Sequence, residues 1–282
     1  MSDSVLQAIV TCMGQPVAGN PTQFMMERAF QAAGLDWRYL TLEIPPQHLA
    51  DAMRGMRVMG FQGGNFTIPH KVAVIEYLDG LSEAAELMGA VNCVNRVDGK
   101  LIGENTDGKG FVQSLSDVLD PTGKNVVIVG AGGAARAIAV ELGLSKVAAI
   151  TVVNRSAERG EELTKLLSER VKVPATFVQL SGHYEIPAGT DIVINATSIG
   201  LGDPDTRVPV IKSSLKSSMV AADVIFNPPD TQFLREAKSQ GCTTLDGLGM
   251  LVNQAVIGFK IWTGVDPDPA VMREALEEYL EL

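Results

Sequence analysis

The stretch "KNVVIVGAGGAARAIAVEL", Lys124 to Leu142, decides the fold class of this 282-residue chain. An apolar run leads into a glycine-rich turn and then an alanine-rich segment, which is the pattern of a strand, a tight turn and a helix. In this GxGxxA spacing, Gly130 permits the turn, Gly132 lets the backbone approach a pyrophosphate, and Ala135 allows close packing of helix on strand. The free N–H groups at the start of such a helix attract anions. The stretch therefore predicts a dinucleotide site.

A second strand follows at the expected distance, in "AAITVVNRS" (Ala148 to Ser156), and the residues at its end indicate which dinucleotide is bound. Sites for NAD usually carry Asp or Glu there, which takes the ribose 2′-hydroxyl. This chain has Asn154 and Arg155, with Arg159 one helical turn further on. A neutral side chain beside a guanidinium suits a 2′-phosphate, so the sequence favours NADP. The alternative is that Arg155 is a solvated surface arginine.

The rest of the chain alternates in the same way and predicts an α/β protein of two domains, which its length also favours. Further strands are expected in "DIVINATSIGL", "SMVAADVIF" and "CTTLD", which with their connectors give a doubly wound, mainly parallel sheet. Before Pro121, strands are expected in "LQAIVTCMG", "WRYLTLEI" and "FQGGNFTI", and helices in "PTQFMMERAFQAAGL" and "PPQHLADAMRGMRVMG". Two more helices are expected in "MLVNQAVIGFKIWTG" and "DPAVMREALEEYLEL". The turn-rich segment Asp120–Gly123 is the expected linker.

Composition excludes several classes of partner. The formal net charge is -10 and no run of Lys or Arg occurs, so the clustered basic surface that nucleic acid requires is missing. The opening "MSDSVLQAIV" lacks the basic and apolar regions of a signal peptide, and no apolar stretch is long enough to span a bilayer. We expect a soluble, cytoplasmic protein. Its three cysteines and three histidines have no spacing typical of a disulfide framework or a metal site.

Eight motifs, in order and over nearly the whole chain, resemble the shikimate dehydrogenase family. They are "GQPVA" (14–18), "GFQGGNFTIPHK" (60–71), "GAVNCV" (89–94), "GENTDGKGF" (103–111), "GAGGAARA" (130–137), "NRS" (154–156), "NATSIGL" (195–201) and "DGLGMLVNQA" (246–255). The resemblance implies an NADP-dependent oxidoreductase that interconverts 3-dehydroshikimate and shikimate, or a closely related cyclic hydroxy acid such as quinate. It also implies a role in chorismate and aromatic amino acid biosynthesis.

The resemblance implies a substrate domain built from residues 1–107 and 247–282, and a Rossmann NADP-binding domain at 108–246. A cleft between the two domains would hold the small-molecule substrate. The sequence leaves the oligomeric state open, with a homodimer among the assemblies considered.

The catalytic pair of the family falls on Lys71, at the end of "NFTIPHK", and Asp107, in "NTD". Moving a hydride between an alcohol and a nicotinamide requires a group that takes or gives the hydroxyl proton. A lysine in a closed cleft can do so, oriented by a nearby carboxylate. From residue types alone, Lys71 would be read as an ordinary surface lysine.

The substrate-binding positions carry over unevenly. Residues that match the family's ligands for ring hydroxyls are Thr67, Asn92, Asp107 and Gln254, while Asn65 is expected to brace its strand. The carboxylate end departs from the pattern: Gly19 replaces a histidine, Asn20 and Thr22 replace two serines, and Phe226 replaces a tyrosine. Shikimate itself is therefore a doubtful substrate.

The expected cofactor-binding residues are Gly130, Ala131, Gly132, Gly133, Ala134, Asn154, Arg155, Ser156, Arg159, Thr197 and Gly247. Two other readings stay open: a non-catalytic NADP-binding or regulatory module of the same fold, and a bifunctional folate-type dehydrogenase. Lys71 and Asp107 speak against the first, and the "NTD" and "GMLxxQ" motifs against the second.

Overall fold

The computed structural model describes residues 6–282, which divide into two compact α/β units. Unit 1 contains residues 6–106 and Gln254–Leu282, and unit 2 contains Asp107–Asn253. The chain passes from one unit to the other inside two helices, α5 (Thr106–Ser116) and α9 (Gly247–Thr263). The expectation that Asp120–Gly123 is the linker is wrong. That segment is a turn within unit 2, in which Thr122 N donates to Asp120 Oδ1 at 2.9 Å and Gly123 has a φ of 71°.

Unit 1 is built on a mixed six-stranded sheet with the order β2-β1-β3-β5-β6-β4. The strands are β1 (Ala8–Gly14), β2 (Trp37–Glu43), β3 (Gly63–Phe66), β4 (Gly80–Leu81), β5 (Cys93–Val97) and β6 (Lys100–Glu104). β1 runs parallel to β2 and β3, whereas β5 runs antiparallel to β3 and β6. The strand expectations for β1, β2 and β3 are confirmed, and the short strands β4, β5 and β6 were not foreseen.

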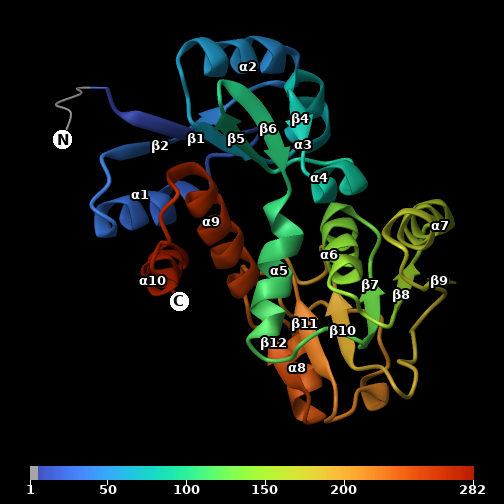
Figure 1. The fold of residues 1–282 in the computed structure, drawn as a ribbon. Helices are drawn as coiled ribbons and strands as arrows, with labels where there is room; N and C mark the ends of the chain where they lie inside the picture. The colour runs from blue at the N-terminus through green and yellow to red at the C-terminus, as the bar shows by residue number, and fades with distance from the viewer. Residues whose placement is uncertain (1–5) are drawn as a thin grey trace. The chain divides into compact units, whose positions relative to one another are not determined.

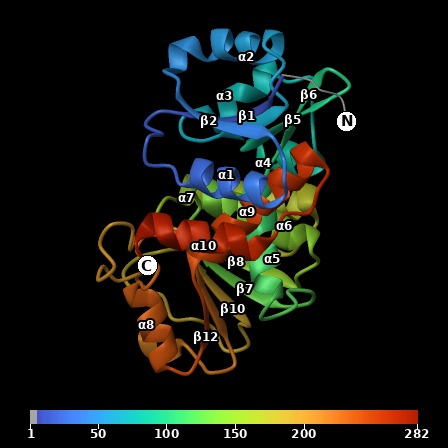
Figure 2. The ribbon, with the colours of Figure 1, turned by 90° about the vertical axis from the view of Figure 1, so that its left-hand side faces the viewer.

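Helices cover both faces of this sheet. They are α1 (Thr22–Ala32), α2 (Leu49–Val58), α3 (His70–Ala73), α4 (Glu83–Met88), the later part of α9, and α10 (Pro269–Leu280), with 3-10 turns at Pro46–His48 and Val74–Tyr77. Figure 2 shows α2 and α3 on one side of β1 and β2, and α1 on the other. Trp262 attaches α9 to the sheet, because its Nε1 donates to Val94 O of β5 at 2.9 Å. A side chain at Gly63 would collide with that indole, so only glycine fits there.

Unit 2 is a parallel six-stranded sheet with the order β12-β11-β10-β7-β8-β9. Its strands are β7 (Asn125–Val129), β8 (Ala149–Asn154), β9 (Ala175–Gln179), β10 (Ile192–Asn195), β11 (Val220–Asp223) and β12 (Thr243–Leu245). Its helices include α5, α6 (Gly133–Leu144), α7 (Ala157–Leu166) and α8 (Gln232–Ser239), with short turns at Leu167–Val171 and Lys212–Ser214 (Figure 1). β10 and the apolar part of β7 are buried throughout, as expected for central strands covered on both faces.

The strand order of unit 2 reverses between β7 and β10. In open parallel sheets, ligands bind outside the carboxyl ends of the strands at such a switch point. The glycine-rich turn after β7 lies at this position, where a nucleotide site is expected.

Candidate functional site

The turn between β7 and α6 is open to a ligand. Gly130 has a φ of 117°, and a side chain there would meet Ala196 O at 2.6 Å, so the position requires glycine. At Gly132 and Gly133 an added Cβ would meet nothing within 4 Å, which leaves the backbone accessible. No side chain among residues 6–282 caps the first turn of α6. An uncapped helix start with accessible N–H groups fits the pyrophosphate of a dinucleotide.

Two arginines follow β8, one in the turn after the strand and one in the first turn of α7. Asn154 Nδ2 donates to Ser156 O at 2.9 Å, and the Ser156 hydroxyl accepts from Arg159 N at 3.4 Å, which caps α7. This short turn leaves Arg155 and Arg159 exposed, and neither guanidinium has a partner among the described residues. Two free guanidiniums beside a neutral Asn fit a phosphate on the ribose.

Two of the expected cofactor residues use their polar groups within the protein. The Thr197 hydroxyl donates to Asn195 Oδ1 at 2.7 Å and accepts from Ile199 N at 3.1 Å. Gly247 N donates to Ile225 O at 3.2 Å, and a side chain at 247 would collide with the backbone after β11. Both positions shape the carboxyl edge of the sheet, and a direct contact with the cofactor stays a prediction.

Asp107 occupies the first turn of α5, at the start of unit 2. The next residue, Gly108, packs directly on α6, because a Cβ there would lie 2.4 Å from Ala137 O. This backbone contact fixes the start of α5 beside the helix that follows the glycine turn. The sequence motif alone gave no hint of that contact.

Lys71 belongs to the short helix α3 of unit 1, and the segment around it is held by backbone hydrogen bonds. Val91 N donates to Lys71 O at 2.7 Å, and His70 N donates to Thr67 O at 2.8 Å. The His70 ring is buried with Nε2 2.7 Å from Ile44 O, which makes this nitrogen the donor and His70 an anchor for the helix. Pairing of Lys71 with Asp107 remains a prediction.

The ammonium of Lys71 acts on a buried thiol. Burial raises the pKa of Cys12 to about 11, while the neighbouring Tyr39 side chain and the positive charge of Lys71 oppose this rise. The Lys71 charge therefore reaches the buried carboxyl end of β1. Thr67 closes the same end, with Thr67 N donating to Met13 O at 3.0 Å and its methyl group filling the space above Gly14.

The residues expected to bind ring hydroxyls include a rigid buried network. Asn92 is 3% exposed; its Oδ1 accepts from Thr106 N at 2.7 Å and its Nδ2 donates to Thr106 Oγ1 at 3.0 Å. Asn65 Nδ2 donates to Asn92 O at 3.0 Å, and Asn65 Oδ1 accepts from the Tyr39 hydroxyl at 2.7 Å. Asn65 therefore braces its strand, as the sequence analysis expects. Gln254, in α9, is also buried.

The positions that depart from the family's carboxylate site have their own local chemistry. Thr22 is 4% exposed at the start of α1, and its N–H donates to Asn20 Oδ1 at 2.9 Å. The NH2 group of Asn20 has no partner among the described residues, so it can donate to a ligand. Phe226 is half-buried in unit 2 and supplies no hydroxyl.

Sequence reasoning missed four polar residues that support these sites: Tyr39, Thr106, Asn195 and Asp223. Tyr39 and Thr106 hold Asn65 and Asn92 through side-chain hydrogen bonds. Asn195 and Asp223 end two neighbouring buried strands, β10 and β11. A polar residue at the end of a buried apolar strand was the available signal for the last two.

Within residues 6–282, no cluster of three His, Cys, Asp or Glu side chains could hold a metal ion. None of the helices in this range is long and apolar enough to cross a membrane.

Models of known families match three parts of the chain. The shikimate dehydrogenase substrate binding domain matches residues 12–94, shikimate / quinate 5-dehydrogenase matches 113–228, and the shikimate 5'-dehydrogenase C-terminal domain matches 247–277. Among curated proteins, the NADP(+) shikimate dehydrogenase of Shouchella clausii is 40% identical over 95% of this chain and 97% of its own length. The corresponding enzyme of Methanopyrus kandleri is 39% identical over 96% of both chains.

Solved structures share the fold and differ in substrate. The 5-ketofructose reductase of Gluconobacter sp. strain CHM43 is 52% identical, with a TM-score of 0.95 over 98% of this chain and 99% of that one. Shikimate 5-dehydrogenase from Listeria monocytogenes, in complex with shikimate and NAD, is 33% identical with a TM-score of 0.93 over 98% of both chains. Quinate dehydrogenase from Corynebacterium glutamicum, in complex with NAD, is 31% identical with a TM-score of 0.89 over 96% and 99%.

Proposed function

Because the chain belongs to the shikimate dehydrogenase family, we propose that it is an NADP-dependent oxidoreductase that interconverts a polyhydroxylated ketone and the corresponding alcohol. We further propose that its preferred substrate is uncharged, with 5-ketofructose as the leading candidate. The observation that carries this proposal is the contrast between the two parts of the expected substrate site. The hydroxyl-binding residues are kept, whereas two of the hydroxyl donors for a carboxylate are lost and the third is kept only on the bulkier Thr22.

The replaced residues favour a neutral ligand. A carboxylate is bound best by several converging donors, and Asn20 and Phe226 remove two of the expected hydroxyls. The Asn20 oxygen accepts from Thr22 N, so the donors that Asn20 offers are the two N–H groups of its amide, which suit neutral hydroxyl or carbonyl oxygens. A sugar-derived ketone has many such oxygens and no carboxylate. The 52% identity to a 5-ketofructose reductase supports the same choice.

The retained residues have roles that follow from their chemistry. Asn92 and Gln254 carry amides, and Thr67 carries a hydroxyl shortly before Lys71 in the sequence; groups of these kinds can pair with substrate hydroxyls. Asn92 also holds Thr106, so it would use its remaining hydrogen-bonding capacity. In ketone reduction, Lys71 gives a proton to the carbonyl oxygen, and in alcohol oxidation it takes the proton back. Asp107 orients the ammonium of Lys71 and maintains its charge.

The nucleotide belongs at the carboxyl edge of the unit 2 sheet. The Gly130–Gly133 turn and the start of α6 fit its pyrophosphate, and Arg155 and Arg159 fit a 2′-phosphate. When bound, the nicotinamide supplies or accepts the hydride. Relatives of this family bind NADP or NAD, and the two free guanidiniums are the reason for proposing NADP here.

Shikimate and quinate form the second candidate substrate class. They are favoured by the curated relatives, which are NADP(+) shikimate dehydrogenases 37–40% identical to this chain. Under this alternative, some group other than the family's hydroxyl donors binds the carboxylate.

Steady-state kinetics with one protein preparation separates these candidates. NADPH oxidation is measured with 5-ketofructose and 3-dehydroshikimate, and NADP reduction is measured with shikimate, quinate and aminoshikimate. We expect kcat/KM for 5-ketofructose to exceed that for 3-dehydroshikimate by about 100-fold, as expected when about two charged-acceptor hydrogen bonds are missing. The Lys71→Ala variant is the control, because activity that persists in it would come from a contaminant.

Equal or better turnover of 3-dehydroshikimate would replace the leading candidate by the second. If the wild-type protein turned over none of these compounds, yet bound NADPH, the non-catalytic module would be the correct reading.

A further inference from the structure

A buried polar pair lies at the carboxyl edge of the unit 2 sheet. Asn195 ends β10 and Asp223 ends β11, the two residues are partners in the sheet register, and both are fully buried. Asn195 Nδ2 donates to Asp223 Oδ1 at 2.9 Å. A buried carboxylate is costly unless it is well hydrogen-bonded, and an apolar pair would stabilise the sheet at least as well. The presence of this pair calls for another explanation.

Asp223 joins three segments of the chain. Besides the Asn195 side chain, its Oδ1 accepts from Ile225 N at 3.1 Å, and its Oδ2 accepts from the Thr231 hydroxyl at 2.7 Å. Thr231 in turn caps α8. One carboxylate thus fixes the end of β10, the loop after β11 and the start of α8.

Asn195 extends this network to the glycine turn. Its Oδ1 accepts from both Thr197 N and the Thr197 hydroxyl, at 3.2 and 2.7 Å, and its Nδ2 also donates to Ile199 O at 3.1 Å. The Thr197 methyl then lies against Gly130, where an added Cβ would be only 3.1 Å away. The loop after β10 therefore packs against Gly130, the first glycine of the turn between β7 and α6.

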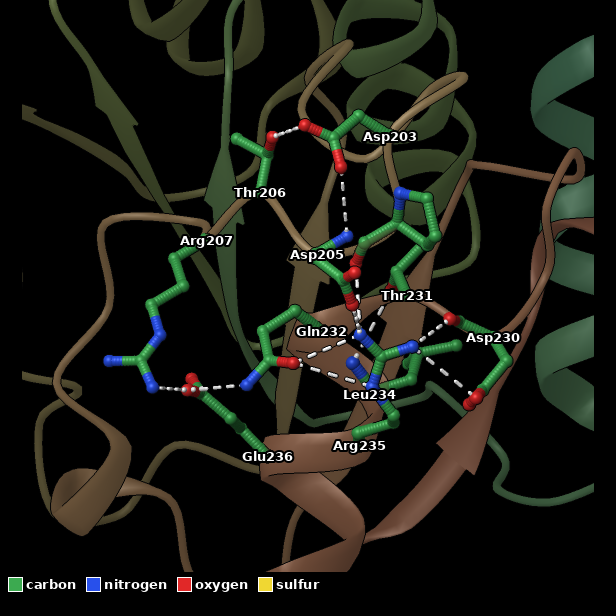
Figure 3. A network of polar contacts seen from close by, with 11 residues as sticks. Asp203, Asp205, Thr206, Arg207, Asp230, Thr231, Gln232, Leu234, Arg235 and Glu236 are labelled. Atoms are coloured by element: carbon green, nitrogen blue, oxygen red, sulfur yellow. Dashed lines mark hydrogen bonds and ion pairs between the residues drawn. The ribbon is translucent and has the colours of Figure 1, made fainter.

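Arg235 forms an outer layer around the same loops. Its guanidinium donates to Pro204 O at 3.3 Å and Asp230 O at 2.6 Å, and forms an ion pair with Asp205 (Figure 3). It also donates to Gln232 Oε1 at 2.9 Å. The loops after β10 and β11 are thus tied to each other at the surface as well as in the interior.

We propose that Asn195 and Asp223 are positioning residues for the nicotinamide half of the dinucleotide, because together they hold the loop after β10 against Gly130. A doubly wound sheet binds one mononucleotide with each half. Arg155 and Arg159 follow β8, so the adenosine half with its 2′-phosphate belongs to the half of the sheet formed by β7, β8 and β9. The other half, which contains β10 and β11, is then left for the nicotinamide half. This inference rests on the proposed NADP-dependent function.

The test compares two ligands that share the adenosine 2′-phosphate. NADPH carries the nicotinamide half, and adenosine 2′,5′-bisphosphate lacks it. Their dissociation constants are measured by calorimetry for the wild type and for Asp223→Asn, Thr231→Val and Thr231→Ser. Asp223→Asn keeps the shape and removes one acceptor, whereas Thr231→Val leaves the carboxylate in place and removes one donor. Ser214→Ala is the matched control, because the Ser214 hydroxyl is a buried hydrogen-bonding group of the same unit, ahead of β11.

For Asp223→Asn and Thr231→Val we expect NADPH binding to weaken on the order of tenfold, with the bisphosphate changed by less than about twofold. Thr231→Ser restores the hydroxyl and should bind both ligands as the wild type does, and so should Ser214→Ala. A purely structural role would weaken the binding of both ligands or of neither. Either result would overturn this inference and leave the proposed NADP-dependent function standing. If the wild type itself fails to bind NADPH, the proposed function falls together with the inference.

Discussion

Thr22 N donates to Asn20 Oδ1 at 2.9 Å, so the side-chain oxygen of Asn20 is committed to the start of α1. The two N–H groups of the Asn20 amide remain as donors for a ligand. Where the family has a serine hydroxyl, which can donate or accept with one atom, this protein has an amide whose donors lie on its nitrogen. That difference is the local basis for expecting an uncharged substrate.

The first prediction concerns shikimate. We expect weak oxidation of shikimate with a high KM and a near-normal kcat, because the missing contacts lie away from the reacting carbon and bind ground and transition states alike. Restoring the family residues with Asn20→Ser, Thr22→Ser and Phe226→Tyr should lower this KM by one to two orders of magnitude, at about 1.5–3 kcal/mol for each restored charged hydrogen bond and with incomplete additivity.

The measurement is a full set of Michaelis curves for the wild type and the triple variant. A triple variant that binds shikimate no better would show that another group holds the carboxylate.

The second prediction concerns Lys71. Replacing it by alanine should lower kcat about 100-fold or more with little change in substrate affinity, as expected for loss of a general acid or base. Lys100→Ala, an exposed lysine of the same unit, is the control and should keep its activity. A kcat near that of the wild type in Lys71→Ala would remove Lys71 from the mechanism.

The third prediction concerns Asp107. Asp107→Asn should reduce kcat less severely than Lys71→Ala, since the amide keeps its hydrogen-bonding reach and loses only the charge that orients the lysine. The measurement is kcat for both variants with the preferred substrate. A kcat of Asp107→Asn equal to that of the wild type argues against the pair.

The fourth prediction concerns cofactor choice. Arg155 is exposed and unpaired among the described residues, and we expect it to meet the 2′-phosphate. Arg155→Ala should raise the KM for NADP about tenfold and leave that for NAD nearly unchanged, because only NADP carries this phosphate. Lys165→Ala, an exposed cation on α7, serves as control. A wild-type preference for NAD would instead make Arg155 an ordinary surface residue.

The fifth prediction uses the titration of Asp223. Burial raises the pKa of this carboxyl above its usual 3.8, and hydrogen bonds from Thr231, Ile225 and Asn195 oppose the rise. The folded state therefore binds this proton more tightly than the unfolded state. The contribution of Asp223 to stability must fall as the pH rises from about 3.8 through the raised pKa, and stay level above it.

Urea unfolding of the wild type and Asp223→Asn across this range checks the sign. The stability of the wild type relative to the variant should be greatest at acid pH and decline as the pH rises. The same comparison with Ser214→Ala, which removes no titrating group, should show no such trend. A relative stability of the wild type that grew with pH would contradict the direction of the shift.

The sequence by itself determined the fold class, the family and the nucleotide turn. These features depend on residues that are close together in the sequence. A buried strand appears as an apolar run, and the start of a helix carries recognisable residues. The turn conformation at Gly130, with a φ of 117°, requires glycine. The short strands β4, β5 and β6 were not predicted from the sequence, because a run of two to five residues shows too little periodicity to be recognised as a strand. The prediction of a domain linker at Asp120–Gly123 was wrong, because turn-forming residues indicate a reversal of the chain and need not indicate a domain boundary.

The tertiary structure decided which polar residues support the site. Asn195 and Asp223 are 28 residues apart in sequence and meet only because β10 and β11 are neighbours in register. Tyr39 reaches Asn65 across the sheet of unit 1, 26 residues away. In the same way, the hydroxyl of Thr197 proved to be occupied within the protein. Hydrogen bonds between distant segments depend on strand order and register, and no local sequence pattern encodes them.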